Sequence, residues 1–201
     1  MTKSLFKSIF LFGIAFWVSS IAFAQTPVAT TKELGASLPA QAAAQALKNF
    51  AHTDGAFFAA GLLKDHYDQT KDLSTLLLYP EDQVMIVKMT GAQLMNAFER
   101  SVSLYPQPNT SFLQLSGFDV TFSKSAPINK RITTALVKGT PIDPSKSYTV
   151  AMPSSLALGG LGYFMVWKKS NIIKTFQGTT IESVLTGKPY VVTSPHWSVV
   201  P

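Results

Sequence analysis

Few side chains in this sequence are of the types that do chemistry. The chain has 201 residues, no cysteine and three histidines, His52, His66 and His196. The lack of cysteine excludes disulfides, thiol catalysis, cysteine-bound zinc and iron–sulfur clusters. One stretch, Asp65-His66-Tyr67-Asp68, gathers several metal-ligand types, but it lacks the spacing of a motif such as H-E-x-x-H. A solvated surface loop is favoured there over a metal site, and we expect no cofactor.

Nucleophile and phosphate-binding motifs are also missing. Ser116, in Gln-Leu-Ser-Gly-Phe, lacks the first glycine of a G-x-S-x-G elbow. The Gly159-Gly160-Leu161-Gly162 stretch has neither a Walker lysine nor dinucleotide-binding spacing, so it indicates a tight turn. Two aromatic residues remain as candidates, Phe112 after a polar loop and Tyr163 after the glycine-rich turn. Such rings can stack on a planar base, and the alternative is ordinary packing in the core.

Composition points to a folded protein with modest positive charge. The chain carries 17 basic and 11 acidic residues, and 46% of its residues are hydrophobic. This balance gives no support to a disordered chain. The basic residues are scattered rather than gathered in a dense stripe, so nucleic-acid binding is not expected. A basic surface attracts small anions such as nucleotides, although ordinary solubility explains the same charge.

The N-terminal segment has the pattern of an export signal. Lys3 and Lys7 precede an apolar stretch, and Ala22-Phe23-Ala24 predicts cleavage after Ala24. The alternative, a membrane anchor, needs about 20 apolar residues, more than this interrupted stretch supplies. We therefore predict a periplasmic or secreted protein with no membrane attachment after cleavage. The predicted organisation is a signal peptide (1–24), a polar leader (25–32), one domain (33–190) and a C-terminal tail (191–201).

The elements that must position the candidate residues are interspersed helices and strands. An amphipathic helix is predicted from residue 37 to near Thr53, and a second begins at Thr90 with Gln93 completing a capping box. A last short helix is predicted after Thr179, ending at Gly187. Predicted strands cover 84–89, 112–122, 132–137 and 148–152, and Gly117 suggests a bulge in the second of them. The irregular order indicates an α+β fold rather than a regular βαβ array.

Several ordered motifs give the chain a resemblance to a known family. Leu78-Tyr79-Pro80-Glu81-Asp82 stands where that family has L-P-F-G-N, and Met89 to Leu94 matches its T-G-x-x-L, with Phe98-Glu99 following. The stretch 111–117 is like the family's F-L-Q-x-S-G, and the stretch 159–163 is like its G-G-D-G-Y. Between them, Lys130-Arg131-Ile132 and the segments 139–143 and 148–151 also match. Together they resemble the C-terminal domain of the 5'-nucleotidase and UDP-sugar hydrolase family.

That resemblance implies a layered α/β/β/α domain that holds the base and ribose of a nucleotide. It also implies that the two family aromatics that sandwich the base correspond to Phe112 and Tyr163. Lys64 stands where the family's N-G-G-G-I-R motif has its arginine, and Gly160 lies in the glycine-rich motif, so both join the candidate ligand-binding residues. Ala59 replaces the asparagine of the first motif, and Leu161 replaces the aspartate of the second. These replacements weaken polar recognition of the ligand.

The resemblance also implies that the metals and catalysis belong to a separate metallophosphoesterase domain, which these 201 residues are too few to include. We therefore expect a non-catalytic nucleotide-binding or nucleoside-binding accessory module of nucleotide catabolism, with a metallophosphoesterase as its partner in trans. Two alternatives stay open. One is hydrolase activity of the chain's own, and the other is a structural exported protein that has lost ligand binding.

Overall fold

The computed structural model describes residues 36–64, 71–190 and 195–201. The predicted signal peptide and leader, and the Asp65–Asp68 cluster, lie outside the described residues. The helices are α1 (Leu38–Ala51), α2 (Gly91–Ser101), α3 (Ser154–Ala157) and α4 (Ile181–Leu185). Short 3-10 helices are η1 (Ala60–Leu62), η2 (Leu73–Leu76), η3 (Gly160–Met165) and η4 (Lys169–Asn171). The strands are β1 (Gly55–Ala59), β2 (Gln83–Thr90), β3 (Leu113–Ser116), β4 (Phe118–Ser123), β5 (Ile132–Val137), β6 (Thr140–Pro141), β7 (Ser147–Pro153), β8 (Ile172–Thr180) and β9 (Trp197–Val200).

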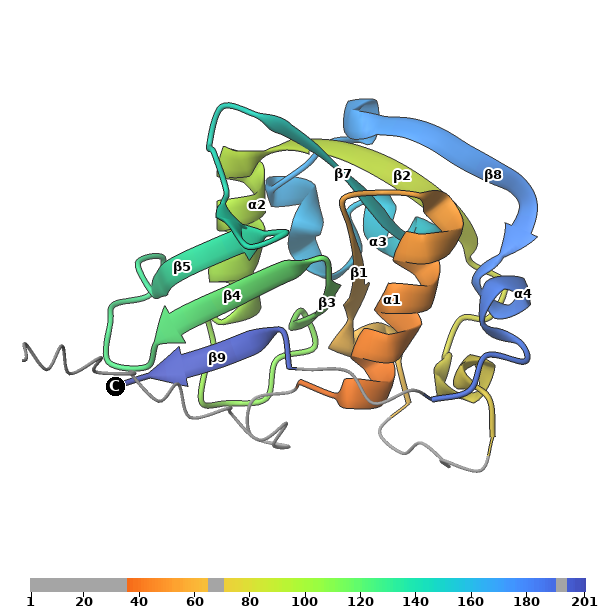
Figure 1. Cartoon of the computed structure of the whole chain (residues 1–201), viewed down its shortest axis with the longest axis horizontal. Coiled ribbons are helices and arrows are strands. Elements are labelled where there is room, and N and C mark those ends of the chain that lie inside the picture. Colours follow the sequence, from red (N-terminus) through yellow and green to blue (C-terminus); the bar gives the residue numbers. More distant parts are fainter. Residues whose placement is uncertain (1–35, 65–70, 191–194) are drawn as a thin grey trace, which may run out of the picture.

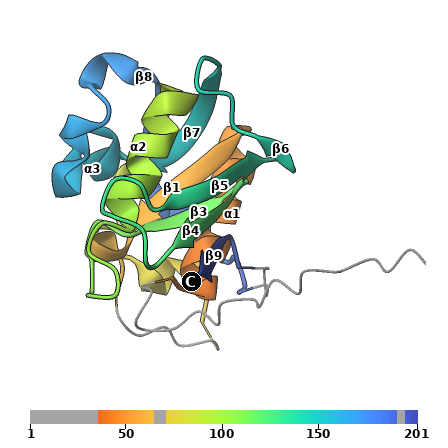
Figure 2. The ribbon, with the colours of Figure 1, turned by 90° about the vertical axis from the view of Figure 1, so that its left-hand side faces the viewer.

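These strands form two mixed sheets. The larger has the order β3-β1-β7-β2-β8 and the smaller β6-β5-β4-β9 (Figure 1). In the larger sheet β1 runs parallel to β7, and its other neighbour, β3, is antiparallel. In the smaller sheet β9 runs parallel to β4. Figure 2 shows the fold turned by 90°, with α2 beside the strands and α1 largely behind them.

The larger sheet is buried on both faces at strand β1. Ala56 and Phe58 of β1 pack into one hydrophobic cluster with α1 and α4. Phe57 and Ala59 point the other way, into a second cluster that contains α2 and the smaller sheet. Successive side chains of a strand alternate between faces, so a strand buried on both sides reads as a continuous apolar run. The run Gly-Ala-Phe-Phe-Ala in β1 has this pattern.

Gly117 separates the two sheets. The single strand predicted over 112–122 is divided there into β3, in the larger sheet, and β4, in the smaller. The φ angle of Gly117 is +83°, and a Cβ atom at this position would lie 2.2 Å from the carbonyl oxygen of Asp54. Only glycine combines this backbone conformation with so close an approach. The predicted bulge is therefore the point where the chain crosses from one sheet to the other.

The α+β prediction is confirmed, and most predicted elements are present. The capping box at Thr90 and Gln93 is formed, and Thr180 caps α4. Strands β1, β6, β8 and β9 are not among the predicted strands. Strand β9 lies within the segment predicted as a C-terminal tail, and its Trp197 is buried in the core.

Candidate functional site

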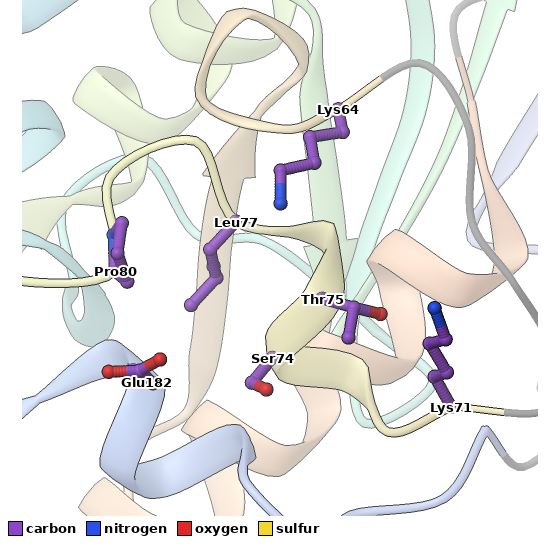
Figure 3. Close-up of a pocket in the computed structure, with 7 residues that line it drawn as sticks. All are labelled: Lys64, Lys71, Ser74, Thr75, Leu77, Pro80 and Glu182. Atoms are coloured by element: carbon purple, nitrogen blue, oxygen red, sulfur yellow. The ribbon is translucent and has the colours of Figure 1, made fainter.

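A cavity of about 440 Å³ opens beside Lys64, one of the predicted ligand-binding residues. Lys64 follows a short bridge between Leu63 and Leu77, and its backbone N–H donates to the carbonyl oxygen of Leu76 over 2.8 Å. These bonds hold the start of the Lys64 side chain above η2. Figure 3 shows its ammonium group pointing into the cavity. A strongly hydrated point charge with three donors can bind a phosphate or another anion at this position.

The rest of the lining mixes hydroxyl groups with charges of both signs. Ser74 and Thr75 come from η2, whose first turn is held by hydrogen bonds from the Ser74 N–H and hydroxyl to the Asp72 carboxylate. Lys71 lies on one side of the cavity and Glu182 on the opposite side (Figure 3). The Ser74 and Thr75 hydroxyls already donate to Asp72, so the ammonium group of Lys64 is the donor that this arrangement offers to an anion, and Glu182 offers a carboxylate acceptor to hydroxyl or amino groups. A ligand with both kinds of group fits it better than a bare anion does.

An exposed aromatic residue adjoins this cavity in the sequence. Tyr79 is 55% exposed and directly precedes Pro80, which lines the cavity. The backbone there is a turn, in which the N–H of Asp82 donates to the carbonyl oxygen of Tyr79. Asp82 in turn accepts a hydrogen bond from the Ser154 hydroxyl, at 2.9 Å, which ties the turn to α3. Tyr79 is thus an accessible residue on an anchored turn, and no chemical motif in the sequence points to it.

Phe112 and Tyr163, the predicted stacking pair, both lie in the hydrophobic core. Their exposed fractions are 2% and 0%. The Phe112 ring lies 5.0 Å from the Trp197 ring, and the Tyr163 ring stacks on Trp167 at 4.6 Å with an interplanar angle of 13°. A ligand between Phe112 and Tyr163 would have to displace this packing. Their predicted role in ligand binding stays a prediction.

Both the ring and the hydroxyl of Tyr163 make contacts in the core. Its hydroxyl donates to the carbonyl oxygen of Ser111 at 2.6 Å, and the guanidinium of Arg100 lies 5.3 Å from its ring centre. Burial raises the pKa of the Tyr163 hydroxyl far above its usual value, with a smaller opposing effect from Arg100. The hydroxyl is therefore held as a hydrogen-bond donor, which joins η3 to the start of β3.

The glycine-rich turn around Gly160 has a packing explanation. A Cβ atom at Gly160 would lie 2.6 Å from the carbonyl oxygen of Ser155, so a side chain does not fit. Leu161 has a φ of 55°, in the left-handed region that disfavours leucine. Its carbonyl oxygen accepts hydrogen bonds from Arg100 and from the Ser111 hydroxyl. These contacts hold the turn, and Gly160 does not line the cavity beside Lys64.

Another motif residue stabilises the fold. The Glu99 carboxylate accepts hydrogen bonds from the backbone N–H groups of Arg131 and Ile132, at 3.0 and 2.8 Å, and so ties α2 to β5. The Arg131 side chain donates to the carbonyl oxygens of Val102 and Tyr105. Two matched motifs that lie about 30 residues apart in the sequence therefore meet in one junction.

Neither a metal-ligand group nor a membrane-spanning helix is found in the described part of the chain. Among residues 36–64, 71–190 and 195–201, no three His, Cys, Asp or Glu side chains are grouped so that they could hold a metal ion. In the same ranges, no helix is long and apolar enough to cross a membrane.

Comparisons with known proteins agree on one family. The family model described as 5'-nucleotidase, C-terminal domain, matches residues 20–168. A snake venom 5'-nucleotidase from Naja atra is 35% identical over 89 residues, which are 40% of this chain and 17% of that protein. A 5'-nucleotidase from Mus musculus is 32% identical over 109 residues, 50% of this chain and 19% of that protein. The chain thus spans about a fifth of the length of these relatives.

Solved structures show the same fold. A 5'-nucleotidase precursor from Thermus thermophilus superposes with a TM-score of 0.65 at 19% identity, covering 84% of this chain and 35% of that one. An NAD nucleotidase from Haemophilus influenzae gives a TM-score of 0.63 at 15% identity, covering 82% and 33%. Because the family model covers most of the sequence and the fold agrees, the chain belongs to the family of 5'-nucleotidase C-terminal domains.

Proposed function

We propose that this protein is an exported, non-catalytic module that binds a nucleotide or nucleoside in the cavity beside Lys64. The observation that carries the proposal is the position of the Lys64 ammonium group, which points into a cavity lined by hydroxyl groups and one carboxylate. Export belongs to the proposal because residues 1–24 have the pattern of a cleavable signal. The module then acts in nucleotide catabolism in the periplasm or outside the cell.

The chemistry of a nucleotide matches this cavity in three parts. Its phosphate is an anion for Lys64, and its ribose hydroxyls can donate to the Glu182 carboxylate. Its base is flat, and the exposed ring of Tyr79, the residue before the cavity-lining Pro80, is the proposed stacking surface. Stacking of one base on an aromatic ring contributes about 1 to 3 kcal/mol. Phe112 and Tyr163 can stack on the base in this proposal only if Trp197 moves away from Phe112 and Trp167 moves away from Tyr163.

Calorimetric titration of the mature protein with AMP, adenosine and UDP-glucose tests the proposal. Lys64→Gln should weaken AMP about tenfold and leave adenosine unchanged, because a charge-assisted bond to phosphate is lost. Tyr79→Ala should weaken both ligands about tenfold. Lys169→Gln, on exposed η4, is the matched control for the charge change. Absence of heat with every ligand would refute nucleotide binding.

The module is further proposed to act in trans with a metallophosphoesterase. The support is the family, since the solved nucleotidase structures that the chain matches align with it over only about a third of their own length. Affinity purification from the native organism should recover such a partner, and recovery of the protein alone would count against it. Phosphate release from AMP by the isolated chain with added Mn²⁺, abolished by a chelator, would show instead that the chain is itself a hydrolase.

One observation favours a second candidate, a structural protein of this fold without ligand binding. Phe112 and Tyr163 are covered by Trp197 and Trp167. If the titrations give no heat while Phe112→Ala and Tyr163→Ala destabilise the fold, the two rings are structural and this candidate stands.

A further inference from the structure

A second cavity lies on the other side of η2 and α4 from the Lys64 cavity. It has a volume of about 710 Å³ and is lined by α1, η2, the end of β8, α4 and the residues that follow α4. Leu73 of η2 lines this cavity, whereas the next two residues line the Lys64 cavity. In the same way, Glu182 of α4 faces the Lys64 cavity and Ser183 the second one. Figure 1 shows α4 beyond α1, at the edge of the larger sheet. We name this cavity the α1–α4 groove.

The groove has an apolar floor and one charge. Ala46 and Phe50 of α1 and Val184 of α4 supply apolar surface, and Phe50 is 39% exposed. Lys188 is the one charged residue among the described residues that line the groove, and no ion-pair partner of its side chain is present in the described part of the chain. Its backbone is fixed, because its carbonyl oxygen accepts from the N–H of Leu73 and its own N–H donates to Leu185. The base of the Lys188 side chain is therefore held at a defined place on the rim.

Phe50, which lines the groove, packs against a second aromatic ring outside the lining. The Phe50 ring lies 5.0 Å from Phe176 of β8, and the ammonium of Lys174 lies 4.1 Å from the centre of the Phe176 ring. Lys188 therefore supplies the positive charge of the lining, and Lys174 adds a positive charge beside the neighbouring Phe176 ring. Gln45 and Asn49 of α1 also line the groove, and both are polar and uncharged. The Gln45 side-chain amide donates to the side-chain oxygen of Asn49 at 2.6 Å.

We propose that the α1–α4 groove binds a small anionic amphiphile, with its acid group at Lys188 and its apolar body against Ala46, Phe50 and Val184. The volume lies in the range of small-molecule sites, about 300 to 1,000 Å³. Charge complementarity selects the class of ligand, since the charge on the lining is positive and the remaining surface is largely apolar. The site is independent of the nucleotide proposed for the Lys64 cavity.

Titration with laurate, kept below its micelle concentration, tests the proposal. Laurate should bind the unmodified protein, and Lys188→Gln should weaken it about fivefold because the pair is at an exposed rim. Dodecanol, which has the same chain without the acid, should bind no better than laurate binds Lys188→Gln. Lys169→Gln, a matched charge change on η4, should leave laurate affinity unchanged. Equal laurate affinity of the Lys188→Gln variant and the unmodified protein would overturn the assignment.

Filling the groove gives a second, independent measurement. Ala46→Phe should abolish laurate binding by occupying the apolar floor. Asn49→Trp should also abolish laurate binding, and because Asn49 is exposed on the same helix, this substitution carries less risk to folding. Circular dichroism and the thermal midpoint check that each variant is folded. Laurate binding that survives both substitutions would overturn the proposal.

Two further results distinguish the groove from the Lys64 cavity and from a surface of self-association. Lys64→Gln should leave laurate binding intact, so that failure of nucleotide binding does not decide the fate of the groove. Sedimentation at several concentrations tests a second copy of the chain as occupant. A dimer that Asn49→Trp disrupts, together with absent laurate binding, would overturn the proposal and assign the groove to self-association.

Discussion

At the scale of single residues, Lys64 is a position at which the sequence differs from the motif that it resembles. The family motif has an arginine at this position, and a lysine cannot make the paired, planar bonds that a guanidinium makes to phosphate. If the Lys64 cavity is the nucleotide site, Lys64→Arg should tighten AMP binding about fivefold to tenfold and leave adenosine unchanged. Calorimetry measures both. A weaker AMP complex in the arginine variant would show that the cavity is shaped for another anion.

Tyr163 offers a residue-scale test of a structural role. Tyr163→Phe keeps the stack on Trp167 but leaves the Ser111 carbonyl oxygen without the hydroxyl donor. The expected loss is about 1 kcal/mol in the free energy of unfolding, the usual net contribution of one hydrogen bond. Urea denaturation followed by tryptophan fluorescence measures it. Unchanged stability combined with weaker AMP binding would instead place the Tyr163 hydroxyl in ligand recognition.

The Asp54 carboxyl makes the stability of the fold depend on pH. Partial burial alone would raise the pKa of its carboxyl, but hydrogen bonds from Thr149 and the charge of Lys138 outweigh burial and lower it. A lowered folded-state pKa means that the carboxylate stabilises the fold above the ordinary value of 3.8, and that this contribution disappears as the pH falls through the lower folded-state value.

Asp54→Asn should therefore cost about 1 kcal/mol at pH 7. The difference between the variant and the unmodified protein should shrink as the pH falls below about 4. Urea titrations across this range provide the test, and a gap that stays constant with pH would exclude this linkage.

At the scale of elements, Gly117 controls how two strands are assigned to two sheets. A Cβ atom there would meet the carbonyl oxygen of Asp54 at 2.2 Å, and the backbone has a positive φ. Gly139 has a similar φ of +77° but nothing within 4 Å of a Cβ atom. Gly139→Ala should thus cost about 1 kcal/mol from backbone strain alone.

Gly117→Ala adds a steric clash to the same strain, so it should cost at least about 2 kcal/mol more than the Gly139 variant. Thermal and chemical unfolding of the two alanine variants compares them directly. Similar losses in both would show that the crossing between the sheets has room for a side chain.

The elements also show what could be predicted from sequence and what could not. Helix α2 and strand β2 carry local signals, a capping box and an apolar run, and both were predicted. Strand β8 alternates weakly, because most of its side chains are exposed or half-buried, and it was missed. The division at Gly117 depends on which neighbours β3 and β4 find, namely β1 for one and β5 with β9 for the other. Such long-range pairing leaves no local pattern.

The candidate site shows the same limit. A motif points to Lys64, whereas Ser74, Pro80 and Glu182 line its cavity from other parts of the sequence. Phe112 and Tyr163 were identified as aromatic residues at loop ends, a pattern that fits a cleft and a core equally well. Their neighbours Trp197 and Trp167 lie 85 and 4 residues away in the sequence. Trp197 lies in the segment predicted as a tail, so nothing local to Phe112 predicts that its ring is covered.

At the scale of the whole molecule, the C-terminal strand closes the core. Trp197 of β9 contacts the rings of Phe98, Phe112 and Phe122, and its indole N–H donates to the carbonyl oxygen of Leu113 at 2.8 Å. One residue of the last strand thus joins α2, β4 and the start of β3, so the domain is incomplete without it. A chain ending at residue 194 would expose this part of the core and leave the outer edge of β4 unpaired.

Trp197→Ala should therefore destabilise the fold by about 3 to 5 kcal/mol, the usual cost of removing a large buried aromatic ring. Trp197→Phe should lose less, since it keeps ring packing and gives up only the indole bond and part of the volume. Val200→Ala, in the same strand but 38% exposed, is the matched control and should change stability by less than about 1 kcal/mol. Urea denaturation followed by circular dichroism measures all three without relying on the mutated fluorophore. If Trp197→Ala unfolds at the same urea concentration as the control, β9 is an appendage and the domain ends near residue 190, as first expected.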